Sequence, residues 1–191
     1  IEALGKERCR VEVINGDQMD PDQVGKATRT KNAIFIGSPK HNLATENALA
    51  ALWCLTPGND SPENAKKAPF QFLWDSDLRR ASAFGARKRG TEKIGVRMSV
   101  AGAKNSRGHH VPVDWLAPEH YARWNGKGRD AGVLVICHKP LGTECNVSSV
   151  ILAGYSGFAT QDMATDFIDD GLRIESGDVQ PGHPVIRVLA A

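Results

Sequence analysis

Residues 32–42 read NAIFIGSPKHN, a run of apolar residues directly before a Gly-Ser-Pro turn. A second stretch has the same order, because residues 150–160 read VILAGYSGFAT. In each stretch a short apolar run ends at a glycine, and a segment with apolar residues at helical spacing follows. Both stretches therefore predict a strand, a tight turn and a helix.

Two helices are predicted after these turns. The first covers residues 43–55, with Asn42 as its N-cap and Thr56-Pro57-Gly58 as its end. The second covers residues 160–170, with Gly171 as the residue that follows its C-terminus. Its spacing predicts a buried face formed by Met163, Ala164, Phe167 and Ile168. A third, short helix is expected at residues 118–124.

The remaining apolar runs are short and mostly continuous, which is typical of strands buried on both faces. Such strands between amphipathic helices predict an α/β fold, Rossmann-like or flavodoxin-like in its layers, with a central mostly parallel or mixed sheet. Residues 76–127 break this rhythm and are expected to be an insertion or extended loop region within a single domain, residues 1–191. The predicted strands are residues 11–14, 33–36, 70–74, 132–137, 150–153 and 185–189, with an alternating edge strand within residues 94–100.

The composition is that of a globular protein, with 41% hydrophobic and 24% charged residues in a chain of 191. The longest apolar runs fall far below the roughly 20 residues that a membrane span needs. No secretion signal is recognisable at the start, so we expect a cytoplasmic protein without membrane contact. Because the chain begins with Ile1, we favour a domain cut from a longer protein.

The four cysteines are widely and irregularly spaced, without a C-x-x-C pair. Cys54 and Cys137 lie inside apolar patterns and are predicted to be small buried residues. Cys9 and Cys145 complete the set. This usage favours free thiols in a reducing compartment.

The two turns predict a ligand site at one edge of the sheet. In open α/β sheets, ligands bind at the carboxyl ends of strands, where helix N-termini favour anions. His138 and Lys139 end another strong strand and would lie at the same edge if the sheet is parallel there. Glu46 and Asp162 lie close by and disfavour a highly charged phosphate. The predicted ligand contacts are Gly37, Ser38, Pro39, Lys40, His41, Asn42, His138, Lys139, Gly154, Tyr155, Ser156, Gly157 and Thr160.

Two resemblances to known families rest on these turns. Gly37-Ser38-Pro39-Lys40, with Asn42 and Thr45, resembles the first phosphate loop of flavodoxin-like, NADPH-dependent FMN reductases. That resemblance implies FMN as the cofactor and phosphate contacts from Ser38 and Asn42. The two turns together, with their helices, resemble a Rossmann-like module found beyond helix-turn-helix segments in bacterial regulators. This second resemblance implies a sensory or effector domain.

The basic stretch between residues 78 and 108 offers a different function. It holds nine Lys or Arg residues and one acid, Glu92. Such a stretch could bind nucleic acid or another polyanion, although its Gly and Ser content and its lack of periodicity favour a solvated loop. The residues that would contact the polyanion are Arg79, Arg80, Arg87, Lys88 and Arg89.

Hydrolase and metal chemistry are weakly supported. Gly154-Tyr155-Ser156-Gly157 is similar to the G-x-S-x-G nucleophile motif, but Phe158 occupies its fifth position and His183 is the sole downstream histidine. His109-His110 could bind a metal with Asp114 or Glu119, yet no H-x-x-x-H pair accompanies them. No metal site is therefore predicted.

The leading hypothesis is a sensory or regulatory domain that binds a small nucleotide-like or phosphate-bearing molecule and acts with other domains of the same chain. Two alternatives stay open: an FMN-dependent, flavodoxin-like oxidoreductase, and a polyanion or nucleic-acid binding module.

Overall fold

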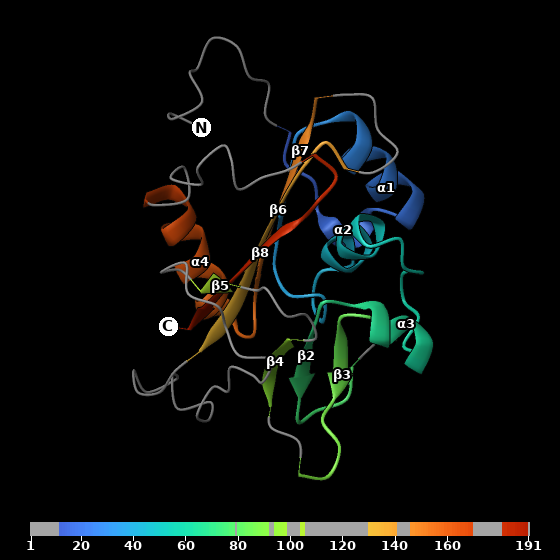
Figure 1. The fold of residues 1–191 in the computed structure, drawn as a ribbon, viewed down its shortest axis with the longest axis vertical. Coiled ribbons are helices and arrows are strands. Elements are labelled where there is room, and N and C mark those ends of the chain that lie inside the picture. Colours follow the sequence, from blue (N-terminus) through green and yellow to red (C-terminus); the bar gives the residue numbers. More distant parts are fainter. Residues whose placement is uncertain are drawn as a thin grey trace.

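A computed structural model describes residues 12–78, 80–91, 94–98, 104–105, 130–140, 146–169 and 181–190. Helices and strands are interleaved in these ranges, so the fold is mixed α/β (Figure 1). The described elements are η2 (Gly16–Gln18), α1 (Pro21–Thr30), β1 (Ala33–Ile36), α2 (Leu43–Leu52), α3 (Pro62–Lys67), β2 (Phe70–Trp74), β3 (Gly85–Arg87), β4 (Gly95–Met98), β5 (Lys104–Asn105), β6 (Ala131–His138), β7 (Ser148–Gly154), α4 (Gly157–Asp169) and β8 (Val185–Ala190).

The described strands form two mixed sheets. The larger sheet has the order β1-β7-β6-β8-β5. In it β1 runs parallel to β7 and β5 runs parallel to β8, whereas β6 runs antiparallel to both of its neighbours. The smaller sheet has the order β3-β2-β4, with β3 parallel and β4 antiparallel to the central strand.

Helices cover both faces of the larger sheet (Figure 1). On one face, Leu134 of β6 and Leu152 of β7 pack against Met163 of α4. On the other face, Val133 and Ile151 belong to the main core, which includes the buried residues of α2. Successive residues of β6 and β7 thus alternate between two apolar layers, which explains why their sequences are continuously apolar.

Local capping explains where the two helices before and after β1 begin. The side chain of Asn42 accepts the backbone N–H groups of Ala44 and Thr45 at the start of α2, as predicted. At the start of α1, Asp20 and Gln23 form a reciprocal capping box. We did not predict α1, although the order Asp-Pro-Asp-Gln is a recognisable helix-start signal.

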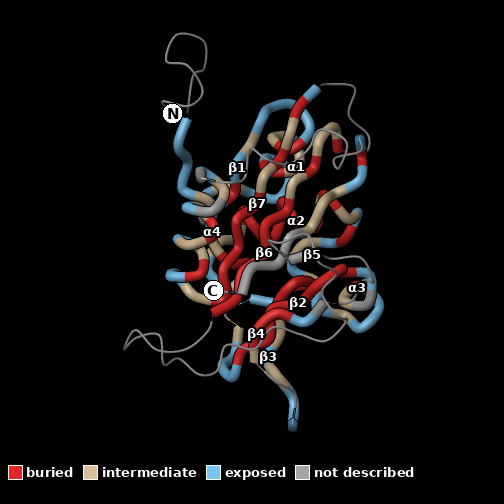
Figure 2. The backbone as a smooth tube through the Cα atoms, turned by 60° about the vertical axis from the view of Figure 1, so that its left-hand side comes forward, coloured by how far each residue is buried: buried red, intermediate tan, exposed pale blue. Residues whose placement is uncertain are grey.

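The smaller sheet is held by aromatic side chains. All five residues of β2 are buried, as the red tube of β2 in Figure 2 shows. Phe70 lies 5.3 Å from Phe84 and 6.2 Å from Trp53, measured between ring centroids. Trp53 follows α2, so these contacts join the smaller sheet to the helix layer.

Most of the predicted strands are found. Residues 33–36, 70–74, 132–137, 150–153 and 185–189 all lie in strands, and β4 is an edge strand within residues 94–100. Residues 12–14 lie in no strand, which corrects the strand predicted at residues 11–14 as far as it is described. The predicted insertion, residues 76–127, contains β3, β4 and β5.

The predicted helices need two corrections. The first ends at Leu52, because the chain leaves the helix at Trp53 and Cys54. The second begins at Gly157, and Ile168 is 72% exposed, so this residue does not belong to the buried face. The helix expected at residues 118–124 and Gly171 lie outside the described residues.

The two described cysteines have different surroundings. Cys137 is buried in the core as predicted, and this burial raises the pKa of its thiol to about 11. Cys54 is exposed, contrary to the prediction, because it takes a left-handed backbone conformation with φ 53° just after α2. Cys9 and Cys145 lie outside the described residues.

Candidate functional site

The two glycine turns meet at one edge of the larger sheet. β1 and β7 are parallel neighbours, with Ile36 opposite Leu152, so both strands end at the same edge. The backbone N–H of Gly37 donates to the carbonyl of Leu152 at 2.9 Å. The turns predicted from separate parts of the sequence are therefore adjacent in space.

The first turn, residues 37–42, is built around Gly37 and Asn42. Gly37 has φ 116°, a conformation that other residues rarely adopt. Asn42 accepts two N–H groups of α2 and donates from Nδ2 to the carbonyl of Ile36 at 2.8 Å. Ser38 and Pro39 are buried, whereas His41 is exposed and Lys40 is half-buried. Lys40 and His41 thus place a cation and an imidazole on the accessible side of this turn.

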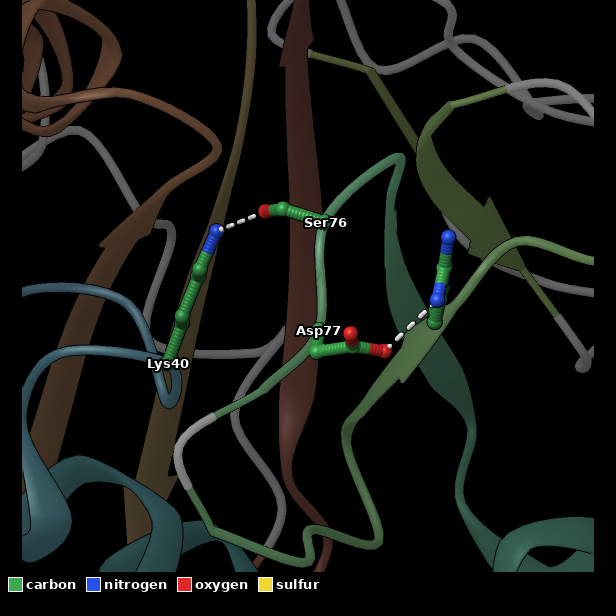
Figure 3. Close-up of polar contacts among 4 residues, drawn as sticks. Lys40, Ser76 and Asp77 are labelled. Atoms are coloured by element: carbon green, nitrogen blue, oxygen red, sulfur yellow. Dashed lines mark hydrogen bonds and ion pairs between the residues drawn. The ribbon is translucent and has the colours of Figure 1, made fainter.

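Lys40 extends from the first turn to the end of β2 (Figure 3). Its Nζ donates to the hydroxyl of Ser76 at 2.7 Å and lies 5.2 Å from the ring centroid of Trp74. A cation held over an indole ring gains about 0.5–2 kcal/mol, depending on how far it is desolvated.

Trp74 also contacts the second turn, residues 154–160. Its ring stacks on Tyr155 with centroids 5.6 Å apart and on Phe72 at 5.5 Å. Trp74 therefore contacts both Lys40 of the first turn and Tyr155 of the second. We did not predict Trp74 or Ser76 as site residues; the available signal was a largely apolar strand that ends directly before a polar Asp-Ser pair.

Close backbone packing explains Gly154. A Cβ atom there would lie 2.2 Å from the amide nitrogen of Thr160 and 2.6 Å from the carbonyl oxygen of Ser156. Thr160 closes the turn, since its Oγ1 accepts from Gly154 N–H at 3.1 Å and donates to the Ser156 carbonyl at 3.0 Å. A Cβ atom at position 157 would meet only open space, so this position does not require glycine for steric reasons.

Ser156 caps α4 and contacts a buried acid. Its Oγ accepts from the N–H groups of Phe158 and Ala159, and its hydroxyl donates to the carboxylate of Asp130. Asp130 comes directly before β6 and reaches this edge because β6 runs antiparallel to β7. We did not predict Asp130, although an acid immediately before the strongest apolar run was a visible signal.

Glu46, in the first turn of α2, is a buried carboxylic acid near this edge of the larger sheet. It is 1% exposed and accepts from the Ser82 hydroxyl at 2.5 Å and the Ala83 N–H at 2.8 Å. Burial raises the pKa of its carboxyl group, and these hydrogen bonds offset part of the effect. Glu46 thereby attaches α2 to the segment that leads into β3.

His138 and Lys139 lie at the opposite edge, which corrects their predicted place. The prediction required a parallel strand, but β6 runs antiparallel to β7 and pairs His138 with Ser148, the first residue of β7. The His138 ring nitrogen Nδ1 lies 3.0 Å from the Ser148 hydroxyl. These two residues therefore cannot share a ligand with the glycine turns.

The same geometry disfavours a serine hydrolase. Gly182 donates its N–H to the carbonyl of His138, so His183 follows a residue at the edge opposite Ser156. The hydroxyl of Ser156 donates to an acid instead of facing a histidine. The described residues thus do not assemble the three groups that this chemistry needs.

The basic residues are described only in part. Arg87 forms an ion pair with Asp77 at 2.9 Å, the second interaction drawn in Figure 3, and both side chains are largely exposed. Arg80 and Arg89 are exposed and Lys88 is half-buried. Arg79, His109 and His110 lie outside the described residues.

Among the described residues, no group of three or more His, Cys, Asp or Glu side chains is placed to hold a metal ion. In the same ranges, the helices are too short or too polar to cross a membrane. Comparisons with protein-family models, curated proteins and solved structures found no match to this chain.

Proposed function

We propose that this chain is a Rossmann-like sensory or regulatory domain that binds a small nucleotide-like or phosphate-bearing molecule at the carboxyl-terminal edge of β1 and β7. The observation that carries the proposal is the position of Lys40. Its ammonium group lies where the first turn, the end of β2 and, through Trp74, the second turn come together. An anionic group of the ligand would bind beside this cation.

Two helix ends support an anionic ligand at this edge. α2 begins directly after the first turn and α4 begins within the second, so the positive ends of their dipoles lie here. Asn42 and Ser156 each accept two of the first N–H groups of these helices. An uncapped helix start offers four unpaired N–H groups. Because two are already capped in each helix, the helix ends attract an anion less strongly, and Lys40 would contribute more to binding it.

Asp130 limits the kind of ligand. Its carboxylate contacts Ser156 at the same edge and would repel a phosphate placed beside the second turn. A carboxylate accepts hydrogen bonds from hydroxyl or amine groups. The arrangement thus fits a molecule with an anionic end beside Lys40 and a hydroxyl-bearing part beside Asp130, as in a nucleotide.

Binding should be tested with Lys40→Met and a matched control, Lys26→Met on the exposed surface of α1. The probes are inorganic phosphate, AMP, ATP, NADPH and FMN, measured by calorimetry and by thermal shift. We expect at least one nucleotide to bind and Lys40→Met to weaken it about tenfold or more, since a charge-assisted hydrogen bond contributes about 1.5–3 kcal/mol. Lys26→Met should bind normally.

Three results would contradict the proposal. The first is that no probe binds, and the second is that both variants bind as the unchanged protein does. The third is binding of FMN alone with a flavin absorbance band, which would favour the oxidoreductase alternative. Because the Lys40 ring contact is with Trp74, a change of intrinsic tryptophan fluorescence on binding, lost in Trp74→Phe, would place the ligand at this edge.

A further inference from the structure

The outer edge of β1 presents backbone groups for another strand. The bond from Gly37 N–H to Leu152 fixes which residues of β1 face β7. Because N–H and C=O groups alternate in direction along a strand, Phe35 faces β7 whereas Ile34 and Ile36 face outward. The Ile36 carbonyl accepts a hydrogen bond from the Asn42 side chain. The N–H and C=O groups of Ile34 and the N–H group of Ile36 therefore face the outer side of β1, where a neighbouring strand could pair with them.

The side chains on this edge are apolar. Ile34 is 56% exposed and Ile36 is 54% exposed, while Phe35 between them is buried. β1 reads AIFI and contains no charged residue. Exposed sheet edges are usually protected by charges, proline, bulges or a covering segment, and β1 has none of the first three within its four residues.

A segment of the same chain lies beside this edge. Glu12 lies 3.9 Å from Lys31, which closely precedes β1. Four residues later, a Cβ atom on Gly16 would meet Asn42, which follows β1. Residues 12–16 therefore run in the same direction as β1.

This segment has the composition of a strand that has not been buried. Val13 is 92% exposed and Ile14 is 49% exposed. The segment is joined to β1 through α1, which is the connection that links parallel neighbouring strands. One side of β1 is occupied by β7, so the outer edge is the side at which the segment can pair.

We propose that residues 13–15 dock on the outer edge of β1 as a sixth, parallel strand of the larger sheet. Pairing would satisfy the Ile34 groups and the Ile36 N–H. It would also place one of Val13 and Ile14 beside the exposed isoleucines, since neighbouring residues of a sheet point to the same face. The docked segment connects directly to Gly16, which packs against the N-cap of α2.

Proline substitution provides a test with a built-in control. Along a strand, alternate N–H groups point to the same neighbour, so Val13 and Ile14 point to opposite sides. A proline removes one N–H group. We expect one of Val13→Pro and Ile14→Pro to accelerate exchange of the Ile34 and Ile36 amide hydrogens at least tenfold, whereas the other changes it little.

Hydrogen exchange should be measured by NMR on the full chain, at two protein concentrations. Slow exchange of both amides in the unchanged protein, independent of concentration, supports the proposal. Exchange at the rate of an unstructured peptide, or equal effects of the two prolines, would overturn it. Protection that rises with concentration, together with a dimer in light scattering, would assign the edge to a second copy and would also overturn it. If a proline variant does not fold, Val13→Ser and Ile14→Ser test the side-chain contact with Ile34 and Ile36 instead, and the serine that removes this contact should accelerate the same exchange.

Discussion

Glu46 shows how a single residue can link two parts of this fold. It belongs to the first turn of α2, but its carboxyl group accepts hydrogen bonds from Ser82 and Ala83, 36 and 37 residues further along the chain. A buried carboxyl group without such partners would destabilise the folded state strongly. Its position therefore ties the helix layer to the smaller sheet, on which the place of Ser76 beside Lys40 depends.

The pH dependence of stability tests this role. Because the pKa of Glu46 is raised in the folded state, its contribution is fully present below its usual value near 4.5 and is lost as the pH rises through the folded-state pKa. Glu46→Gln removes this titration. We expect the stability of the unchanged protein, relative to Glu46→Gln, to increase as the pH falls from 8 to 4 in urea unfolding. Parallel pH profiles of the two proteins would contradict the assignment.

The glycines of the second turn differ in what they tolerate. The Cβ atom of Gly154→Ala would clash with the backbone of residues 156 and 160, and we expect a loss of stability of about 3 kcal/mol, near the upper end for overpacked sites. Gly157→Ala has open space and should stay within about 1 kcal/mol of the unchanged protein. Chemical denaturation measures both. Equal losses would show that the space around Gly157 is not available.

At the scale of elements, the end of α2 carries an identifiable strain. Cys54 has φ 53° in the position where helices usually end with glycine. The N–H of Leu55 donates to the Ala50 carbonyl at 2.9 Å, which closes the helix end around this residue. The exposed thiol contributes little packing that could offset the strain.

We therefore expect Cys54→Gly to stabilise the protein by about 1 kcal/mol, the usual cost of a left-handed conformation for a residue with a Cβ atom. Thermal unfolding in the presence of a reductant measures the change. Cys54→Ala, which keeps the Cβ atom and the strain, is the control and should differ little from the unchanged protein. A gain of the same size in both variants would point to the thiol instead of the backbone.

At the scale of the whole molecule, the candidate site is assembled from segments far apart in the chain. Lys40 comes from the first turn, and Trp74 and Ser76 come from the end of β2 and the residues just after it. Tyr155 and Ser156 come from the second turn, and Asp130 directly precedes β6. The stacked rings of Trp74 and Tyr155 connect the two sheets at this place. A ligand bound here would therefore contact both parts of the fold, which suits the regulatory role that we propose.

The elements that border the candidate site could be predicted from local patterns in the sequence. The apolar run of β1, the glycine turn after it and the Asn42 cap of α2 were all predictable, because each depends on residues within a few positions. The same holds for β7 and the turn at Gly154. The capping box of α1 was equally local and could have been found.

Only the tertiary structure decided which of these elements meet. Strand order and direction depend on pairings between distant segments, which no local pattern encodes. The antiparallel direction of β6 moved His138 and Lys139 away from the turns and brought Asp130 to them. The smaller sheet likewise placed Trp74 against Tyr155. The sequence by itself thus determined the two glycine turns and the helices that follow them, and long-range packing determined which side chains surround them.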